Sequence, residues 1–106
     1  MPEAAPMIQV FQAEWCPFSA LVRQRLNELD LPFVALPVPP AREDRDVMHE
    51  RTGTRVIPAV ILEDGTVLAG DAAEIVAELD RCFPEPETAA AHKRALAQHP
   101  LGQIIG

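Results

Sequence analysis

The sequence predicts an α/β domain: a mixed four-stranded sheet flanked by helices, with an extra helix near the C-terminal end. Three observations predict this fold. The chain has 106 residues, 48% hydrophobic and 24% charged, which is the composition of one ordinary globular domain. Its first half has a strand–helix–strand pattern, which implies a parallel pair joined by a right-handed crossover. A later hairpin pattern adds antiparallel strands, so the sheet should be mixed.

The first third of the chain predicts a strand, a helix and a second strand. Residues 7–11 alternate apolar and polar side chains, which is typical of a half-buried strand. Pro17 suits the first turn of a helix, and the helical pattern ends near Asp30. Residues 32–36 predict the second strand. The apolar stripe of the helix is expected to be Val22, Leu26 and Leu29, with Leu21 beside them.

The middle of the chain predicts a solvated helix and a hairpin. The highly charged residues 42–51 favour a solvated helix, closed by Gly53. Residues 56–62 predict a buried strand. Asp64–Gly65 then favours a tight primed turn, leading into a short return strand over residues 67–69. The inner face of the charged helix is expected to consist of Val47 and Met48.

The last third predicts two helices, over residues 71–83 and 87–98, and a loose tail over residues 100–106. The side chains expected to pack into the core from the first of these helices are Ile75, Val76, Leu79, Cys82 and Phe83. The expected organisation is therefore one domain over residues 1–84 and a C-terminal helical extension over residues 85–106.

Composition narrows the possible partners and the compartment. The formal net charge of −7 repels phosphate backbones and anionic lipids, so nucleic-acid and membrane binding are not expected. No run approaches the roughly 18 apolar residues of a membrane span, and residues 1–6 lack the pattern of a signal peptide. We therefore expect a cytoplasmic protein. Two cysteines in that reducing compartment favour reactivity over a structural crosslink, and their spacing does not suit a metal site.

Cys16 is the candidate nucleophile. It lies between the first strand and the first helix, where unpaired N–H groups and the positive end of the helix dipole favour a thiolate over a thiol. A thiolate is the attacking species in disulfide exchange. Ser19 lies one turn further along and can offer its hydroxyl to the same sulfur. The alternative is a buried cysteine that only fills space.

A second feature is the proline at the start of a predicted core strand. Pro58 cannot donate a hydrogen bond to a neighbouring strand, so it is out of place there with a trans bond. A cis Ile57–Pro58 bond in a special turn beside the active site would explain it. That turn would leave backbone groups of Ile57 free to pair with an extended thiol peptide. The alternative is a trans proline on an edge strand.

These residues resemble two related families. Cys16–Pro17–Phe18–Ser19 is similar to the Cys-Pro-Tyr-Cys motif of glutaredoxins, with serine in place of the second cysteine. Thr54–Pro58 resembles their Arg-Thr-Val-Pro segment, whose proline is cis. The run from Cys16 to Leu36 is also similar to the N-terminal domain of glutathione transferases, as are residues 64–68 with 73–75. The resemblance covers about residues 7–83 and implies a thioredoxin-like fold.

The resemblance implies a monothiol, glutaredoxin-like thiol–disulfide oxidoreductase. Glutathione or another low-molecular-weight thiol would be its co-substrate, protein disulfides its other partners, and no tightly bound cofactor is expected. Cys16 would be the catalytic nucleophile, and Ser19 would tune its thiolate. At the start of the helix after the hairpin, Asp71 is a candidate N-cap, and backbone N–H groups there could bind a carboxylate. The residues expected to bind the thiol substrate are Trp15, Pro17, Phe18, Arg55, Ile57, Pro58, Asp71 and Ala72.

Two alternatives remain open from the sequence. Ala13, Ala72 and Ala73 stand where the related families carry polar ligand-binding residues. This pattern favours a non-catalytic binding module related to the transferase N-terminal domain. The other alternative is an iron–sulfur carrier, although Pro17 replaces the glycine of the Cys-Gly-Phe-Ser motif that such carriers resemble.

Overall fold

The computed structural model describes residues 7–99 and has the predicted order of strands and helices. The expectations for residues 1–6 and for the tail over residues 100–106 lie outside the described residues. The strands are β1 (Ile8–Gln12), β2 (Phe33–Pro37), β3 (Ala59–Ile61) and β4 (Val67–Leu68). The helices are α1 (Pro17–Glu28), α2 (Asp46–Thr52), α3 (Ala72–Cys82) and α4 (Ala89–Gln98).

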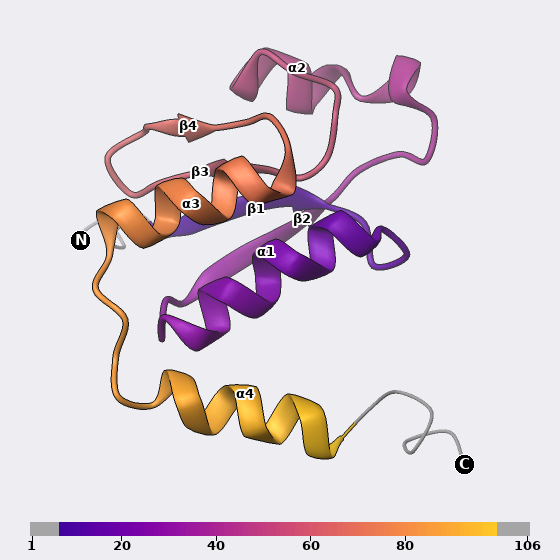
Figure 1. The fold of residues 1–106 in the computed structure, drawn as a ribbon. Helices are drawn as coiled ribbons and strands as arrows, with labels where there is room; N and C mark the ends of the chain where they lie inside the picture. Colours follow the sequence, from indigo (N-terminus) through magenta and orange to yellow (C-terminus); the bar gives the residue numbers. More distant parts are fainter. Residues whose placement is uncertain (1–6, 100–106) are drawn as a thin grey trace, which may run out of the picture.

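The strands form one mixed sheet in the order β2-β1-β3-β4, which confirms the predicted architecture (Figure 1). The β1–β2 pair is parallel, with Val10 opposite Ala35, while β3 pairs antiparallel with both β1 and β4. The crossover from β1 to β2 contains α1, so the residues just after β1 lie at the start of a helix at one end of the sheet.

The two faces of the sheet are covered unequally. Helices α1 and α3 lie side by side over one face, and the main core fills the space between them and the sheet (Figure 1). A smaller cluster lies on the other side, where the buried Met48 of α2 packs with Phe11 and Ala59. Cys16 belongs to this second cluster, so the candidate nucleophile packs with residues of β1, α2 and β3. The residues contributed by α1 and α3 to the main core are Val22, Leu26, Leu29, Ala72, Ile75 and Leu79.

The predictions for the charged stretch and for the third strand were partly wrong. The charged stretch is not one helix: a 3-10 helix over Arg42–Asp44 precedes α2, and the two are separated at Arg45. Val47 is exposed, so Met48 alone forms the inner face of α2. The third strand begins only at Ala59, because residues 56–58 form a turn around a cis peptide bond.

The hairpin has a different turn from the predicted one. A primed two-residue turn requires positive φ at its first central residue, and in type I′ at both, but of Asp64 and Gly65 only Gly65 has it, at 91°. The N–H of Gly65 donates to the Leu62 carbonyl at 2.9 Å, and the N–H of Leu62 donates to the Thr66 carbonyl at 2.8 Å. The connection is therefore longer, with Gly65 as the left-handed residue that closes it.

Cys82 is exposed, which corrects its expected place in the core. It lies at the last position of α3. On the same stripe Ile75 and Leu79 are buried, and Val76 and Phe83 are partly buried against the core. The periodicity of α3 is therefore right, and Cys82 is the residue of the expected stripe that is exposed to solvent.

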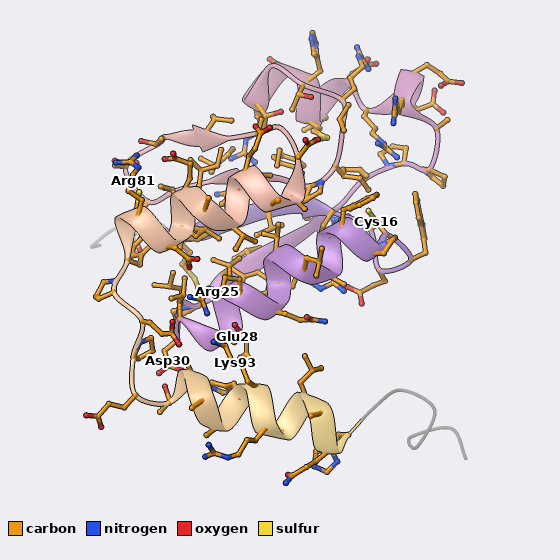
Figure 2. All side chains as sticks on the ribbon, viewed as in Figure 1. Cys16, Arg25, Glu28, Asp30, Arg81 and Lys93 are labelled. Carbon is orange, nitrogen blue, oxygen red and sulfur yellow. The ribbon has the colours of Figure 1, made fainter. Side chains whose placement is uncertain are left out.

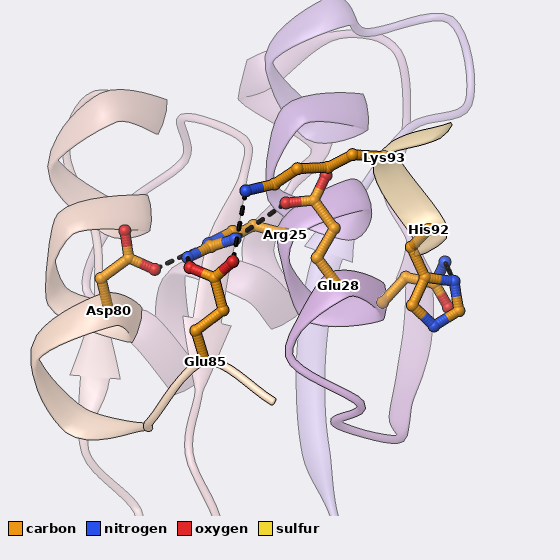
Figure 3. Close-up of polar contacts among 7 residues, drawn as sticks. Arg25, Glu28, Asp80, Glu85, His92 and Lys93 are labelled. Atoms are coloured by element: carbon orange, nitrogen blue, oxygen red, sulfur yellow. Dashed lines mark hydrogen bonds and ion pairs between the residues drawn. The ribbon is translucent and has the colours of Figure 1, made fainter. Parts of the chain in front are cut away.

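Helix α4 packs against α1 through polar groups rather than a broad apolar face (Figure 3). Arg25 of α1 binds Glu28, Asp80 and Glu85 at 2.8, 2.7 and 3.1 Å, and Lys93 of α4 binds the same Glu85 at 3.3 Å. These ion pairs join α1, α3 and α4 through the segment that connects the last two helices. None of the helices within residues 7–99 combines the length and the apolar character that crossing a membrane requires.

Candidate functional site

Cys16 is the N-cap residue of α1, as the position of Pro17 predicted. Its backbone is extended, and its carbonyl accepts the N–H of Ala20 at 3.1 Å, the first hydrogen bond of the helix. The side chain takes the capping role usually filled by an oxygen, because the N–H of Ser19 donates to Sγ at 3.4 Å. Figure 2 shows Cys16 at this end of α1, away from the Arg25 cluster at the other end.

The environment of Cys16 favours its thiolate. Burial of the residue, which is 6% exposed, raises the pKa of the thiol. The hydroxyl and N–H of Ser19 outweigh this, together with the N–H of Phe18 and the charge of Arg23, so the pKa of Cys16 lies below its ordinary value. The Ser19 hydroxyl is fully buried and makes no hydrogen bond of ordinary geometry within residues 7–99, so it is free to stabilise a thiolate at Cys16.

Glu14 does not act on Cys16 as an isolated negative charge. Its exposed carboxylate lies 3.7 Å from the guanidinium of Arg23, which also donates to the side chain of Gln12. Arg23 is the cation whose charge lowers the pKa of Cys16, and it is only partly exposed. The carboxylate near the nucleophile in sequence is therefore paired with the arginine whose charge favours the thiolate.

The Ile57–Pro58 peptide bond is cis, which confirms the interpretation of the proline at the start of β3. Both residues are buried and line a cavity of about 600 Å³ together with Cys16. The start of α3 lines the same cavity through Asp71, Ala72 and Ala73. Three segments far apart in the sequence thus meet around the sulfur: the start of α1, the cis turn before β3 and the start of α3.

Most of the predicted site residues meet in this cavity. Ser19 lies beneath the sulfur and is completely buried. Arg55 is not among the residues that line the cavity; its guanidinium pairs with Asp46 at 2.8 Å and reaches the carbonyls of Arg42 and Glu43. The predicted residues that line the cavity with Cys16 are Trp15, Pro17, Phe18, Ile57, Pro58, Asp71 and Ala72.

The start of α3 leaves backbone donors free. Asp71 occupies the N-cap position, as predicted, but its side chain makes no capping hydrogen bond. The first N–H groups of a helix have no partner inside the helix, and residues 71–73 line the cavity. This end of α3 can therefore bind a carboxylate without a polar side chain at Ala72 or Ala73.

Sequence reasoning missed two arginines on the cavity wall. Arg42 and Arg45 both line the cavity, and Arg45 is buried, being only 4% exposed. They come from the charged stretch that predicted a solvated helix. The sequence feature that could have indicated their position is the group of prolines just before this stretch. Prolines make a stiff connection, which can direct the charged segment back against the domain.

An apolar rim surrounds the sulfur on the side of α1. Trp15, Phe18 and Leu21 are 65%, 59% and 51% exposed, and all three line the cavity. Val56 adds a further exposed apolar side chain from the segment before the cis bond. The cavity therefore has a cationic side at Arg42 and Arg45 and an apolar side at the start of α1.

A family model described as the N-terminal domain of glutathione S-transferase matches residues 10–87. The chain belongs to this family. The match includes every residue that lines the cavity and ends before α4. It confirms the resemblance to transferase N-terminal domains that the sequence motifs indicated. No curated protein matched the chain.

Solved structures share the thioredoxin-like fold. Glutaredoxin 2 from Salmonella typhimurium, in complex with glutathione, is 17% identical with a TM-score of 0.63, over 76% of this chain and 36% of that one. A glutathione transferase homologue from Sulfitobacter, with bound glutathione, is 21% identical with a TM-score of 0.62, over 88% and 48%. A glutathione S-transferase domain-containing protein from Marinobacter aquaeolei is 25% identical with a TM-score of 0.59, over 74% and 40%. The chain thus spans between 36% and 48% of the length of these relatives.

Proposed function

We propose that this domain is a thiol–disulfide oxidoreductase that works by a monothiol mechanism, with Cys16 as nucleophile and glutathione or another low-molecular-weight thiol as co-substrate. The observation that carries the proposal is the position of Cys16. Its sulfur caps a helix, has a lowered pKa, and lines the same cavity as the cis Ile57–Pro58 turn. A thiolate beside an open cavity is the arrangement that disulfide exchange requires.

The reaction has two exchange steps. The Cys16 thiolate attacks the glutathione sulfur of a mixed disulfide, which forms a Cys16–glutathione disulfide and releases the other thiol as a thiolate. A second glutathione thiolate then attacks the glutathione sulfur bound to Cys16. This step releases glutathione disulfide and returns Cys16 as a thiolate, so the electron pair that left with the first thiolate is replaced by that of the attacking glutathione thiolate.

An external thiol completes the cycle because the chain offers no resolving cysteine near Cys16. Ser19 occupies the position of the second cysteine and cannot form a disulfide. Cys82 lies at the far end of α3, ten residues from the Ala72 that lines the cavity. That separation is about 15 Å along the helix, far beyond the reach of a disulfide bond.

The charges of the cavity support a thiol that carries carboxylates. Arg42 and Arg45 place positive charge on one wall, and the start of α3 offers unpaired N–H groups on another. Two of the solved relatives hold glutathione, a thiol with two carboxylates, in the same fold. Glutathione is therefore the first thiol to test, and the reducing cytoplasm is the compartment in which this chemistry runs.

The test is intact-mass analysis after exposure to glutathione disulfide. Because Cys82 is exposed, it can react nonspecifically and must be removed first. In a Cys82→Ser background we expect one added glutathione that is lost again when excess glutathione is supplied. Cys16→Ser in the same Cys82→Ser background is the matched control and should add no glutathione.

Three outcomes separate the alternatives. Fast, reversible addition at Cys16 supports the proposal. Fast alkylation of Cys16 without reaction with glutathione disulfide contradicts the choice of glutathione and favours another small thiol. A Cys16 thiol that resists both reagents in the folded protein contradicts the oxidoreductase and favours the non-catalytic binding module.

The family match favours glutathione conjugation as a second candidate. Here the thiolate of bound glutathione would attack an electrophile such as 1-chloro-2,4-dinitrobenzene, forming a carbon–sulfur bond and releasing chloride. The exposed apolar rim at Trp15, Phe18 and Leu21 suits an aromatic electrophile. Conjugation would persist in the Cys16→Ala protein if glutathione itself supplies the thiolate, whereas disulfide exchange would be abolished.

A further inference from the structure

Arg45 is a buried arginine without an acidic partner. It separates the 3-10 helix from α2, serving as the cap residue of both, and is 4% exposed. Within residues 7–99 its guanidinium makes no ion pair with a carboxylate, in contrast to Arg25 and Arg55. Burying a charged group is unfavourable unless its donors are satisfied. The hydrogen-bond partners of the Arg45 guanidinium therefore indicate the structural role of this residue.

The guanidinium of Arg45 joins two separate segments through three backbone carbonyls. Nε donates to Pro39 and Nη2 donates to Pro40, at 2.8 and 2.9 Å, in the connection that follows β2. Nη1 donates to the carbonyl of Arg55 at 2.9 Å, two residues before the cis bond. Arginine suits this task because its planar fork presents several donors in fixed directions.

Both joined segments form walls of the cavity. Pro40 lines it from the first segment, and Val56, Ile57 and Pro58 line it directly after the Arg55 carbonyl. Other contacts also hold residues 54–58: Thr54 exchanges hydrogen bonds with the Thr52 hydroxyl, the Arg55 guanidinium binds Asp46, and Ile57 and Pro58 are buried. Among the hydrogen bonds within residues 7–99, those of Arg45 are the ones that tie the backbone of this segment to the connection after β2. The position of this wall relative to the connection that lines the cavity with it therefore depends on Arg45.

We propose that Arg45 is a positioning residue of the thiol site, which fixes the Val56–Pro58 wall opposite Cys16 and so controls binding of the thiol substrate. This inference rests on the proposed function. The reactivity of Cys16 arises separately, because its hydrogen bonds come from the first turn of α1. Loss of Arg45 should accordingly weaken substrate binding and leave the nucleophile unchanged.

The experiment compares Arg45→Met and Arg45→Lys in a Cys82→Ser background, with Arg42→Met and Arg51→Met as controls. Arg42→Met removes a cavity cation but none of the three hydrogen bonds, and Arg51 lies on α2 with its guanidinium over Phe11, away from the cavity. The substrate is the cysteine–glutathione mixed disulfide, with glutathione as reductant. Three quantities are measured: the KM and kcat for this disulfide, the pH profile of Cys16 alkylation by iodoacetamide, and hydrogen exchange of residues 54–60.

For both Arg45 variants we expect KM to rise roughly tenfold, the effect of losing about one charge-assisted hydrogen bond. We expect kcat and the alkylation profile to stay unchanged, and residues 54–60 to exchange faster. Lysine should not rescue, because it keeps the charge but not the fork. Arg51→Met should match the parent protein, and Arg42→Met should keep the slow exchange of residues 54–60.

Three results would overturn the inference. The first is full rescue by Arg45→Lys, which would make charge rather than positioning the cause. The second is a shifted alkylation profile, which would place the action of Arg45 on Cys16 itself. The third is unchanged exchange of residues 54–60 in the Arg45→Lys protein, which also decides the case if Arg45→Met fails to fold. If the parent protein does not turn over the mixed disulfide, the proposed function fails, while the exchange measurement still decides whether Arg45 holds the wall.

Discussion

The groups that lower the pKa of Cys16 come almost entirely from the first turn of its own helix. Ser19 contributes both its hydroxyl and its N–H, and Phe18 contributes its N–H. Burial acts in the opposite direction and raises the pKa. Reactivity at this residue is therefore a balance between desolvation and local hydrogen bonds, and a single side chain can change it.

Ser19→Ala should raise the pKa of Cys16, because it removes the buried hydroxyl that favours the thiolate. The Ser19 hydroxyl is buried and makes no hydrogen bond of ordinary geometry within residues 7–99, so its loss should scarcely affect folding. The check is the rate of iodoacetamide alkylation against pH in a Cys82→Ser background. An unchanged midpoint would mean that the N–H groups alone stabilise the thiolate.

At the scale of single elements, helix α1 follows from local rules. Its start is fixed by Cys16 and Pro17. Its end is a Schellman motif, in which Asp30 has a φ of 56° while its N–H donates to Asn27 and that of Leu31 donates to Leu26. The apolar stripe between them faces the sheet and α3.

Substitutions on the two faces of α1 should have different effects on stability. Leu26→Ala should lower the free energy of unfolding by about 2–5 kcal/mol, since Leu26 is fully buried and alanine would leave a cavity. Leu21→Ala, on the exposed side of the same helix, should change it by less than about 0.5 kcal/mol. Urea titrations of the two variants test this, and equal losses would contradict the assignment of faces.

The elements that the sequence predicts well are those decided by short-range patterns. Helices α1 and α3 follow from their periodicity, and the cis bond follows from a proline that no ordinary core strand accommodates. The charged stretch was misjudged because its break at Arg45 depends on carbonyls of Pro39, Pro40 and Arg55. A charge pattern by itself contains no information about such partners.

The residues of the candidate site also differ in whether the sequence predicts them. Cys16 and Pro58 could be found from the sequence, since each is unusual at its own position in the chain. The contribution of Arg45 could not, because it arises only when the connection after β2 folds against the segment before β3. The same reasoning applies to Cys82, because helical spacing places it on the apolar stripe of α3 and only the folded structure shows that it is exposed.

At the scale of the whole molecule, the packing of α4 rests on charged groups (Figure 3). Asp30 accepts from the Thr88 hydroxyl and lies 3.3 Å from Nε2 of His92, while Glu85 connects Arg25 with Lys93. Ala89 is the buried residue that α4 contributes. Because ionic contacts at the surface are screened by salt and lost on protonation, α4 should be the element whose packing responds most to solution conditions.

Acid should release α4 before it disrupts the main core. The Thr88 hydroxyl and His92 hold the pKa of Asp30 below its ordinary value, and Arg25 and Lys93 do the same for Glu85. A carboxylate whose pKa is lowered by folding stabilises the folded state above its unfolded pKa, about 4, and that contribution disappears as the pH falls through the folded value. Protection of residues 89–98 against hydrogen exchange, corrected for the intrinsic rate, should therefore fall between pH 5 and 3 while that of α3 persists.

Asp30→Asn should weaken the protection of α4 already at pH 7. Glu78→Gln, which removes only an exposed partner of Arg81 within α3, should leave it unchanged. Equal protection of α4 at pH 7 and pH 3 would mean that apolar contacts, not these charges, hold the helix in place.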